Sequence, residues 1–280
     1  MKKISTSQIA QEIEKLLNEA NFILPNDIYE NLISMREQEI TALAKETFNV
    51  LIENADIAKN EKIPLCQDCG VTIILIELGQ EIYLEGKDLY TEINSSIEKA
   101  YQHNYLRKSV VADPLRRKNT GTNTPAFIHT DIVPGDKLNI TVYIKGGGSE
   151  NMTSLKMFRP TDTTHEIIKY IKETIIDAGP NPCPPIYLGI GIGGTADIAM
   201  LNSKKAVLRK VGKRHQDPYY SDLELTIKEI LNNTNIGPLG FGGKSTVAEV
   251  YIKEAPTHIA TLPVALNLNC HSFRYRTITL

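Results

Sequence analysis

The stretch "IPLCQDCGVTIILIEL", residues 63–78, marks the point at which the character of this chain changes. Before it, residues 4 to about 60 carry apolar side chains at the three- and four-residue spacing typical of amphipathic helices. In its second half, residues 71–78 form a short apolar run typical of a buried strand. The polar and sulfur-bearing residues 66–69 are therefore expected in a turn between a helical region and a strand.

Helix and strand patterns alternate beyond this point. Residues 165–179, "HEIIKYIKETIIDAG", form an amphipathic helix with Gly179 where a left-handed cap is common. We also predict helices over residues 89–105 and 221–232 and from about Thr195, and strands within 137–152, over 186–190 and near Val207. The expected fold is mixed α/β (α+β): a helical N-terminal part, about 4–60, packs on a mixed α/β body, and residues 1–280 are interpreted as one domain.

Composition excludes several classes of protein. The chain has 280 residues, 41% hydrophobic and 23% charged, enough to bury a sizeable core. A net charge of −2 gives no bulk attraction to nucleic acid or to an anionic membrane. The longest apolar run is far shorter than the roughly 20 residues of a membrane-spanning helix, and the start, "MKKISTSQIA", lacks the apolar centre of a signal peptide. We expect a cytoplasmic protein with no nucleic-acid or membrane partner.

Two glycine-rich segments resemble nucleotide-binding motifs. "GIGIGG", residues 189–194, fits G-x-G-x-x-G between a strand and a helix, but Arg209 and Lys210 stand where an acidic residue for the ribose is expected. We interpret these glycines as permitting close helix–strand packing. "GPLGFGGKST", residues 237–246, resembles a phosphate loop, but Pro238 replaces its first glycine and a helix precedes it. A tight loop that presents backbone N–H groups is the preferred interpretation.

A third glycine segment, "GGGSEN" at residues 146–151, follows a predicted strand. Three consecutive glycines cost backbone entropy, and a plain turn does not require them. They allow backbone amides to approach a ligand closely, and successive backbone N–H groups of this kind typically bind an anion. A binding role and a simple bulge both remain open for this segment.

The four cysteines are too few and too dispersed for a disulfide scaffold. Cys66-x-x-Cys69 suggests a redox pair or half a zinc site, but strand residues follow it and no second close pair exists. Isolated cysteines are also often small buried hydrophobes. Cys183 in "NPCPP" and Cys270 in "NLNCHSFR", however, stand in loops, as Cys66 does. Three thiolates on three loops could hold an iron–sulfur cluster by three corners and leave the fourth iron as a Lewis acid.

Several stretches spread over nearly the whole chain together resemble the α subunit of class I, iron–sulfur-dependent fumarate hydratases and the related tartrate dehydratases. They are "CQDCG", "LRKS", "KNTGTNTPA", "KGGGSEN", "NPCPP", "FGGKST" and "PTHIATLPVALNLNCHSFR". The resemblance implies a [4Fe–4S] cluster with Cys66, Cys183 and Cys270 as its ligands. The family motif has threonine where this chain has Cys69. We interpret Cys69 as a neighbour of the cluster and not as a fourth ligand, because a fourth ligand would close the open iron.

The resemblance also implies substrate contacts. Gln67, Arg107 and the backbone of Gly148 match residues that bind substrate, and arginine is suited to bidentate carboxylate pairing. Asp68 matches the residue proposed for proton transfer beside the carboxylate, and His258 matches a histidine at the substrate site. A histidine in a loop can also be a satisfied structural residue.

The implied reaction is the reversible hydration of fumarate to (S)-malate, a step of the tricarboxylic acid cycle. L-Tartrate dehydration is the alternative within the family, and a zinc-binding or redox-active C-x-x-C protein is the alternative outside it. The resemblance further implies a β subunit, or a C-terminal domain in fused members, that completes the active site around a small dicarboxylate. An α2β2 hetero-oligomer is the expected assembly.

Overall fold

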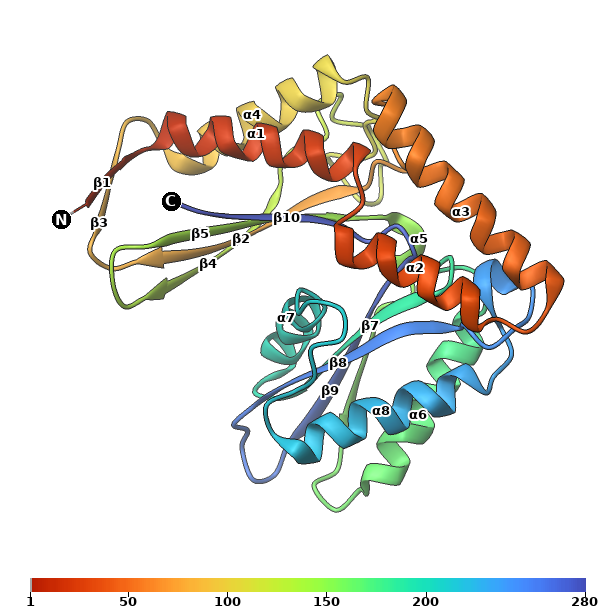
Figure 1. Cartoon of the computed structure of the whole chain (residues 1–280). Helices are drawn as coiled ribbons and strands as arrows, with labels where there is room; N and C mark the ends of the chain where they lie inside the picture. Colours follow the sequence, from red (N-terminus) through yellow and green to blue (C-terminus); the bar gives the residue numbers. More distant parts are fainter. Residues whose placement is uncertain (1) are drawn as a thin grey trace. The chain divides into compact units, whose positions relative to one another are not determined.

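The computed structural model describes residues 2–280, which divide into two compact units (Figure 1). Unit 1 comprises the chain up to Pro25 together with Asn54–Gly147 and Arg274–Leu280. Unit 2 comprises Asn26–Glu53 and Gly148–Phe273. The chain therefore passes between the units more than once, and each unit is assembled from segments that are distant in sequence.

Unit 1 is built on a sheet with the strand order β10-β5-β2-β4. The central strands β2 (Val71–Gly79) and β5 (Leu138–Lys145) are antiparallel. β10 (Arg274–Thr279) pairs antiparallel with β5, and β4 (Phe127–Val133) pairs parallel with β2. A separate parallel ribbon joins the short strands β1 (Lys2–Ser5) and β3 (Ile82–Glu85).

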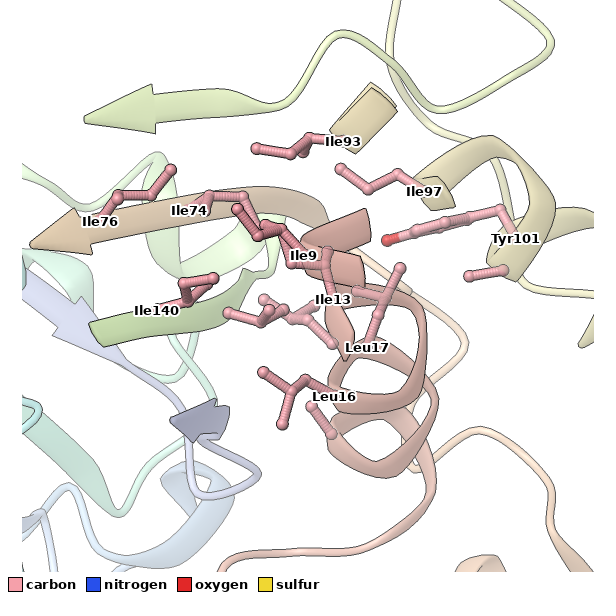
Figure 2. Close-up of a cluster of buried hydrophobic side chains, with 14 of the residues drawn as sticks. Ile9, Ile13, Leu16, Leu17, Ile74, Ile76, Ile93, Ile97, Tyr101 and Ile140 are labelled. Carbon is pink, nitrogen blue, oxygen red and sulfur yellow. The ribbon is translucent and has the colours of Figure 1, made fainter. Parts of the chain in front are cut away.

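Helices α1 (Thr6–Phe22) and α4 (Leu89–His103) supply the helical side of the unit 1 core. Their apolar stripes meet side chains from β2 and β5 in one buried cluster (Figure 2) that includes Ile9, Ile13, Leu17, Ile93, Ile97, Tyr101, Ile74, Ile76 and Ile140. The intervening residues of β2, Ile73 and Leu75, are also buried. Burial on both faces explains why this strand has a continuous apolar run instead of an alternating pattern.

Unit 2 contains α2 (Asn26–Gln38), most of α3 (Ala42–Glu61), and a sheet with the order β6-β9-β7-β8. The strands are β6 (Ser154–Phe158), β7 (Ile186–Gly193), β8 (Val247–Ala255) and β9 (Leu262–Asn269). β7 is parallel to β8 and antiparallel to β9, which is antiparallel to β6. The short helix α5 (Gly147–Glu150) precedes β6, and α6 (Thr164–Ala178) lies between β6 and β7. Between β7 and β8 the chain forms α7 (Ala196–Ala206), α8 (Pro218–Asn232) and the 3-10 turn η1 (Pro238–Gly240).

Glycines in β7 determine how closely α7 can pack on this sheet. A Cβ atom on Gly189 would lie 1.9 Å from the carbonyl oxygen of Ser203, and one on Gly191 would lie 1.9 Å from that of Ala199. The alternate residues of β7, including Leu188, belong to the cluster formed with α6 and α8. The expectation that these glycines permit close helix–strand packing is confirmed.

The mixed α/β fold and the N-terminal helices are confirmed, and Gly179 ends α6 with a positive φ of 51°. The strand predicted near Val207 is wrong: Val207 caps the end of α7 and is buried against Gly189. Its β-branched side chain serves packing there and does not join a sheet. No helix within residues 2–280 has the length and apolar character needed to cross a membrane. The interpretation of residues 1–280 as one domain stays a prediction.

Candidate functional site

The Cys66–Cys69 loop of unit 1 connects α3 to β2 and is held by hydrogen bonds between side-chain atoms and backbone groups. The Asp68 N–H donates to Cys66 Sγ at 3.4 Å. The two Asp68 carboxylate oxygens accept from different segments: Oδ1 from the Gly70 N–H at 2.9 Å, and Oδ2 from the Gly147 N–H at 2.7 Å. Asp68 therefore links its own loop to the glycine segment and presents a carboxylate of defined orientation.

The Asp68 carboxylate lies close to the backbone of this glycine segment. A Cβ on Gly146 would be 3.3 Å from Asp68 Oδ2, and one on Gly147 would be 3.6 Å from the same atom. Gly148, the first residue of unit 2, would place a Cβ 3.1 Å from the Asn181 carbonyl oxygen. The glycine run thus allows close approach to loops on which candidate site residues lie.

Cys69 differs from Cys66 although it is only three residues away. Cys66 is half-buried, whereas Cys69 is only 2% exposed and belongs to the α1–α4 core cluster. Its Sγ accepts the Arg107 N–H at 3.2 Å. Burial raises the pKa of the Cys69 thiol, although the hydrogen bond from Arg107 and the positive charge of Arg274 oppose the rise. Cys69 is therefore a neutral, internally bonded thiol.

Arg274, the first residue of β10, contacts the same loop. Its side chain is 1% exposed, and Nη2 donates to the Asp68 carbonyl oxygen at 2.9 Å. Within the described residues, Nε and Nη1 have no hydrogen-bond acceptor. A buried guanidinium is costly unless it is paired, and the bond to the Asp68 carbonyl offsets part of that cost.

The loop that carries Arg107 is fastened by Asn123, a buried residue with a positive φ of 62°. Asn123 Oδ1 accepts the N–H groups of Ser109 at 2.6 Å and Val110 at 3.1 Å, while Nδ2 donates to the Gly70 carbonyl at 3.1 Å. Asn123 lies in the segment "KNTGTNTPA", whose sequence alone predicted no role for it. The Asn-Thr-Pro pattern was the available signal, since asparagine tolerates this backbone conformation.

In unit 2 the register of the sheet brings the Cys183 and Cys270 loops to the same edge. Cys183 precedes β7 and Cys270 follows β9, and Tyr187 pairs with Asn269 across these antiparallel strands. The Cys183 carbonyl accepts the His271 N–H at 3.2 Å and lies 3.1 Å from His271 Nδ1. The two cysteine loops are therefore directly joined.

The thiols of these loops are accessible. Cys183 is exposed with a positive φ of 54°, and Cys270 is half-buried with its Sγ 3.3 Å from Ser272 Oγ. The loop at residues 237–246 supports this edge, because the Leu239 N–H donates to the Pro184 carbonyl at 2.9 Å. The expectation of a tight loop is confirmed, and the N–H groups of Leu239, Gly242 and Gly243 form hydrogen bonds within unit 2.

Gln67 and Arg107 are exposed residues of unit 1. His258 lies in unit 2 between β8 and β9, where its Nδ1 accepts the Ala260 N–H at 3.1 Å. At about 3.3 Å per residue, β9 separates this loop from the Cys270 end of the strand by about 23 Å. The structure therefore does not bring His258 to the Cys270 loop of its own unit, and a substrate role for it stays a prediction.

The donor atoms suit an iron–sulfur cluster. All four cysteines are free thiols; Cys66, Cys183 and Cys270 are exposed or half-buried, whereas Cys69 is enclosed. A backbone N–H directed at Cys66 Sγ is a type of hydrogen bond that tunes cluster sulfurs. Cys66 belongs to unit 1, and Cys183 and Cys270 belong to unit 2. Within residues 2–280 there is no preassembled group of three His, Cys, Asp or Glu side chains that could hold a metal ion.

Comparison with known proteins agrees with the motifs. Residues 10–279 match the model of the family described as fumarate hydratase (Fumerase). The chain is 40% identical over 273 residues to a putative L(+)-tartrate dehydratase subunit alpha of Methanocaldococcus jannaschii, covering 95% of each chain. It is 32% identical over 286 residues to the L(+)-tartrate dehydratase subunit alpha of Escherichia coli strain K12, covering 98% of this chain and 94% of that one. The chain belongs to the fumarate hydratase family, and the resemblance stated from its motifs is confirmed.

Proposed function

We propose that this chain is the α subunit of a [4Fe–4S]-dependent hydro-lyase that reversibly hydrates fumarate to (S)-malate. The observation that carries the proposal is the contrast among its four thiols. Cys66, Cys183 and Cys270 are accessible in the loops that bear the family motifs, and Cys69 is enclosed and hydrogen-bonded. Three ligands leave one iron open, as a reaction at a substrate hydroxyl requires.

Cys66, Cys183 and Cys270 would hold the cluster. When bound, the cluster supplies a Lewis acid for the hydroxyl group, which is otherwise a poor leaving group. The Asp68 N–H would remain directed at the sulfur of Cys66.

The residues around the loop would bind and orient the substrate. Arg107 is exposed and can form a bidentate pair with a carboxylate, and Gln67 offers an exposed amide as a second proposed contact. The Gly148 N–H is a third proposed contact. Asp68 would take the proton from the carbon beside a carboxylate when malate is dehydrated and return it on hydration. Its two backbone hydrogen bonds orient the carboxylate for that transfer.

A partner subunit would complete this site. The proposed contacts of this chain include one arginine for a substrate with two carboxylates, and an unpaired buried carboxylate is costly. The similar proteins named above are called alpha subunits, which supports a β subunit as the source of the missing charge. We propose an α2β2 hetero-oligomer.

L-Tartrate dehydration is the second candidate, favoured by the names of those relatives. It needs the same open iron and the same two carboxylate sites. The alternative of a C-x-x-C zinc or redox protein is opposed by the burial of Cys69, because both sulfurs of such a pair would have to reach the metal or the redox partner.

The test is anaerobic purification of the chain with and without its β subunit, followed by iron analysis and assays with fumarate, malate and L-tartrate. We expect a brown protein, about four irons per chain as the proposed cluster requires, and turnover only when β is present. Preference between the two substrates decides between the two candidates. A colourless, zinc-containing protein, or full turnover by the isolated chain, would refute the corresponding part of the proposal.

A further inference from the structure

Cys69 Sγ lies between two residues with different proposed tasks. It accepts the backbone N–H of Arg107 at 3.2 Å, and its own S–H points to the carbonyl oxygen of Cys66 at 3.8 Å. The first bond reaches the segment of the proposed substrate-binding arginine, and the second reaches the loop of a proposed cluster ligand. One buried side chain therefore bridges the two segments.

The residues around Cys69 are buried and hydrogen-bonded, which holds both ends of this bridge. The Tyr101 hydroxyl donates to the Cys69 carbonyl oxygen at 2.7 Å, and Tyr101 is itself fully buried. Leu106, which precedes Arg107, is 3% exposed and packs in the same core cluster. The backbone at Arg107 is thus held from within the core while its side chain is exposed.

We propose that Cys69 is a positioning residue, which fixes the Arg107 backbone against the Cys66–Asp68 loop and thereby sets the affinity for the substrate carboxylate. The inference rests on the proposed function for the identity of the ligand, a four-carbon dicarboxylate. Misplacement of a binding group by about 1 Å is enough to impair a reaction. The hydrogen bond from the Arg107 N–H to Cys69 therefore affects substrate binding, although Cys69 itself does not contact the substrate.

The chemistry of the side chain explains why cysteine can stand where the family motif has threonine. A thiol is a weak donor and acceptor, and a hydroxyl is a stronger one, but both can accept one N–H and donate to one carbonyl. Valine has nearly the shape of threonine but can do neither. The Cys69→Thr and Cys69→Val variants therefore form a matched pair. Their side chains have nearly the same volume, but only threonine can form the hydrogen bonds to Arg107 and to the Cys66 carbonyl.

The experiment uses the anaerobically reconstituted complex of this chain with its β subunit. We expect Cys69→Val to raise both KM and the Kd of the non-reacting dicarboxylate succinate about tenfold, since the partly buried Arg107 N–H loses its acceptor. Its kcat should change less than about threefold, and its iron content should equal that of the wild type. Cys69→Thr should restore wild-type KM and succinate Kd. If Val is not accommodated, Cys69→Ala removes the same bonds with a smaller side chain.

A second readout is independent of activity. Amide hydrogen exchange at Arg107 in the full-length chain should be faster in Cys69→Val than in Cys69→Thr. Equal exchange, KM and Kd in the two variants would overturn the positioning role. Loss of iron from both would instead make Cys69 a ligand and would also overturn it. Absence of turnover in the wild-type complex with all three substrates would refute the proposed function, while the exchange comparison would still decide the role of Cys69.

Discussion

The Cys66 loop of unit 1 and the two cysteine loops of unit 2 are held in different ways. Around Cys66, the contacts come from side chains: the carboxylate of Asp68, the guanidinium of Arg274 and the thiol of Cys69. Around Cys183 and Cys270, they are largely backbone bonds that follow from the register of β7 and β9. Single substitutions should therefore disturb the first loop more than the second, wherever the cysteines themselves are kept.

The largest expected effect is the loss of bound iron when single cysteines are replaced by serine. Cys66→Ser, Cys183→Ser and Cys270→Ser should each lose nearly all bound iron, because a serine oxygen is a poor replacement for a thiolate ligand of an iron–sulfur cluster. Cys69→Ser should retain most of it, since this side chain is enclosed in the core. Iron and sulfide analysis after anaerobic reconstitution measures how much cluster each variant binds. Equal loss in all four variants would contradict the three-ligand assignment.

Alkylation of the metal-free chain should distinguish the same residues by accessibility. Iodoacetamide reacts with thiolates, and burial raises the pKa of Cys69, which lowers its thiolate fraction at any given pH below that pKa. Cys183 is exposed and should be labelled in the folded chain, whereas Cys69 should be labelled only after unfolding. Peptide mass spectrometry identifies the sites, and rapid labelling of Cys69 in the folded chain would contradict its enclosed position.

Two arginines on one strand offer a matched comparison for the unit 1 loop. Arg274→Met removes the donor to the Asp68 carbonyl, and we expect kcat/KM to fall about tenfold. Arg276 lies two residues further along β10 and donates instead to the Ile23 carbonyl at 2.8 Å, near the end of α1. Arg276→Met should lower the free energy of unfolding by about 1–2 kcal/mol and change kcat/KM less than about twofold.

We expect Arg274→Met to lose mainly activity and Arg276→Met to lose mainly stability. Circular dichroism melting measures the stability, and kinetics of the complex measure the activity. The loss of stability in Arg274→Met should be smaller, because Nε and Nη1 have no acceptor among the described residues and their removal relieves a cost. A fall in kcat/KM of the same size in both variants would show that general destabilisation, and not support of the Asp68 backbone, is responsible.

The smallest effect is expected in unit 2. His271→Ala removes the ring nitrogen that lies 3.1 Å from the Cys183 carbonyl but keeps the backbone N–H that donates to the same oxygen. Iron content should therefore stay within about a fifth of the wild-type value, because one of the two contacts and the strand register remain. A large loss of iron would show that unit 2 also depends on a side chain to hold its cysteine loops.

The helices and the cysteine-bearing motifs were accessible from local pattern. Helical spacing in the N-terminal part and the glycine after α6 are properties of neighbouring residues, and so is the apolar run of β2. Val207 shows the limit of such patterns, because a β-branched residue can end a helix when a glycine on the adjacent strand makes room for it. The strand β1 was not predicted because its partner, β3, begins about 80 residues later.

The sequence by itself determined the family of this protein, its predominantly helical beginning and the three loops in which accessible cysteines lie. These features depend on residue type and short-range spacing. Only the tertiary structure decided that Cys69 bonds the Arg107 backbone, that Asp68 joins the glycine segment, and that Arg274 supports the Asp68 carbonyl. Those bonds join groups 38, 79 and 206 residues apart in the chain. Contacts at such separations arise from strand pairing and from burial in a common core, and no local pattern encodes either.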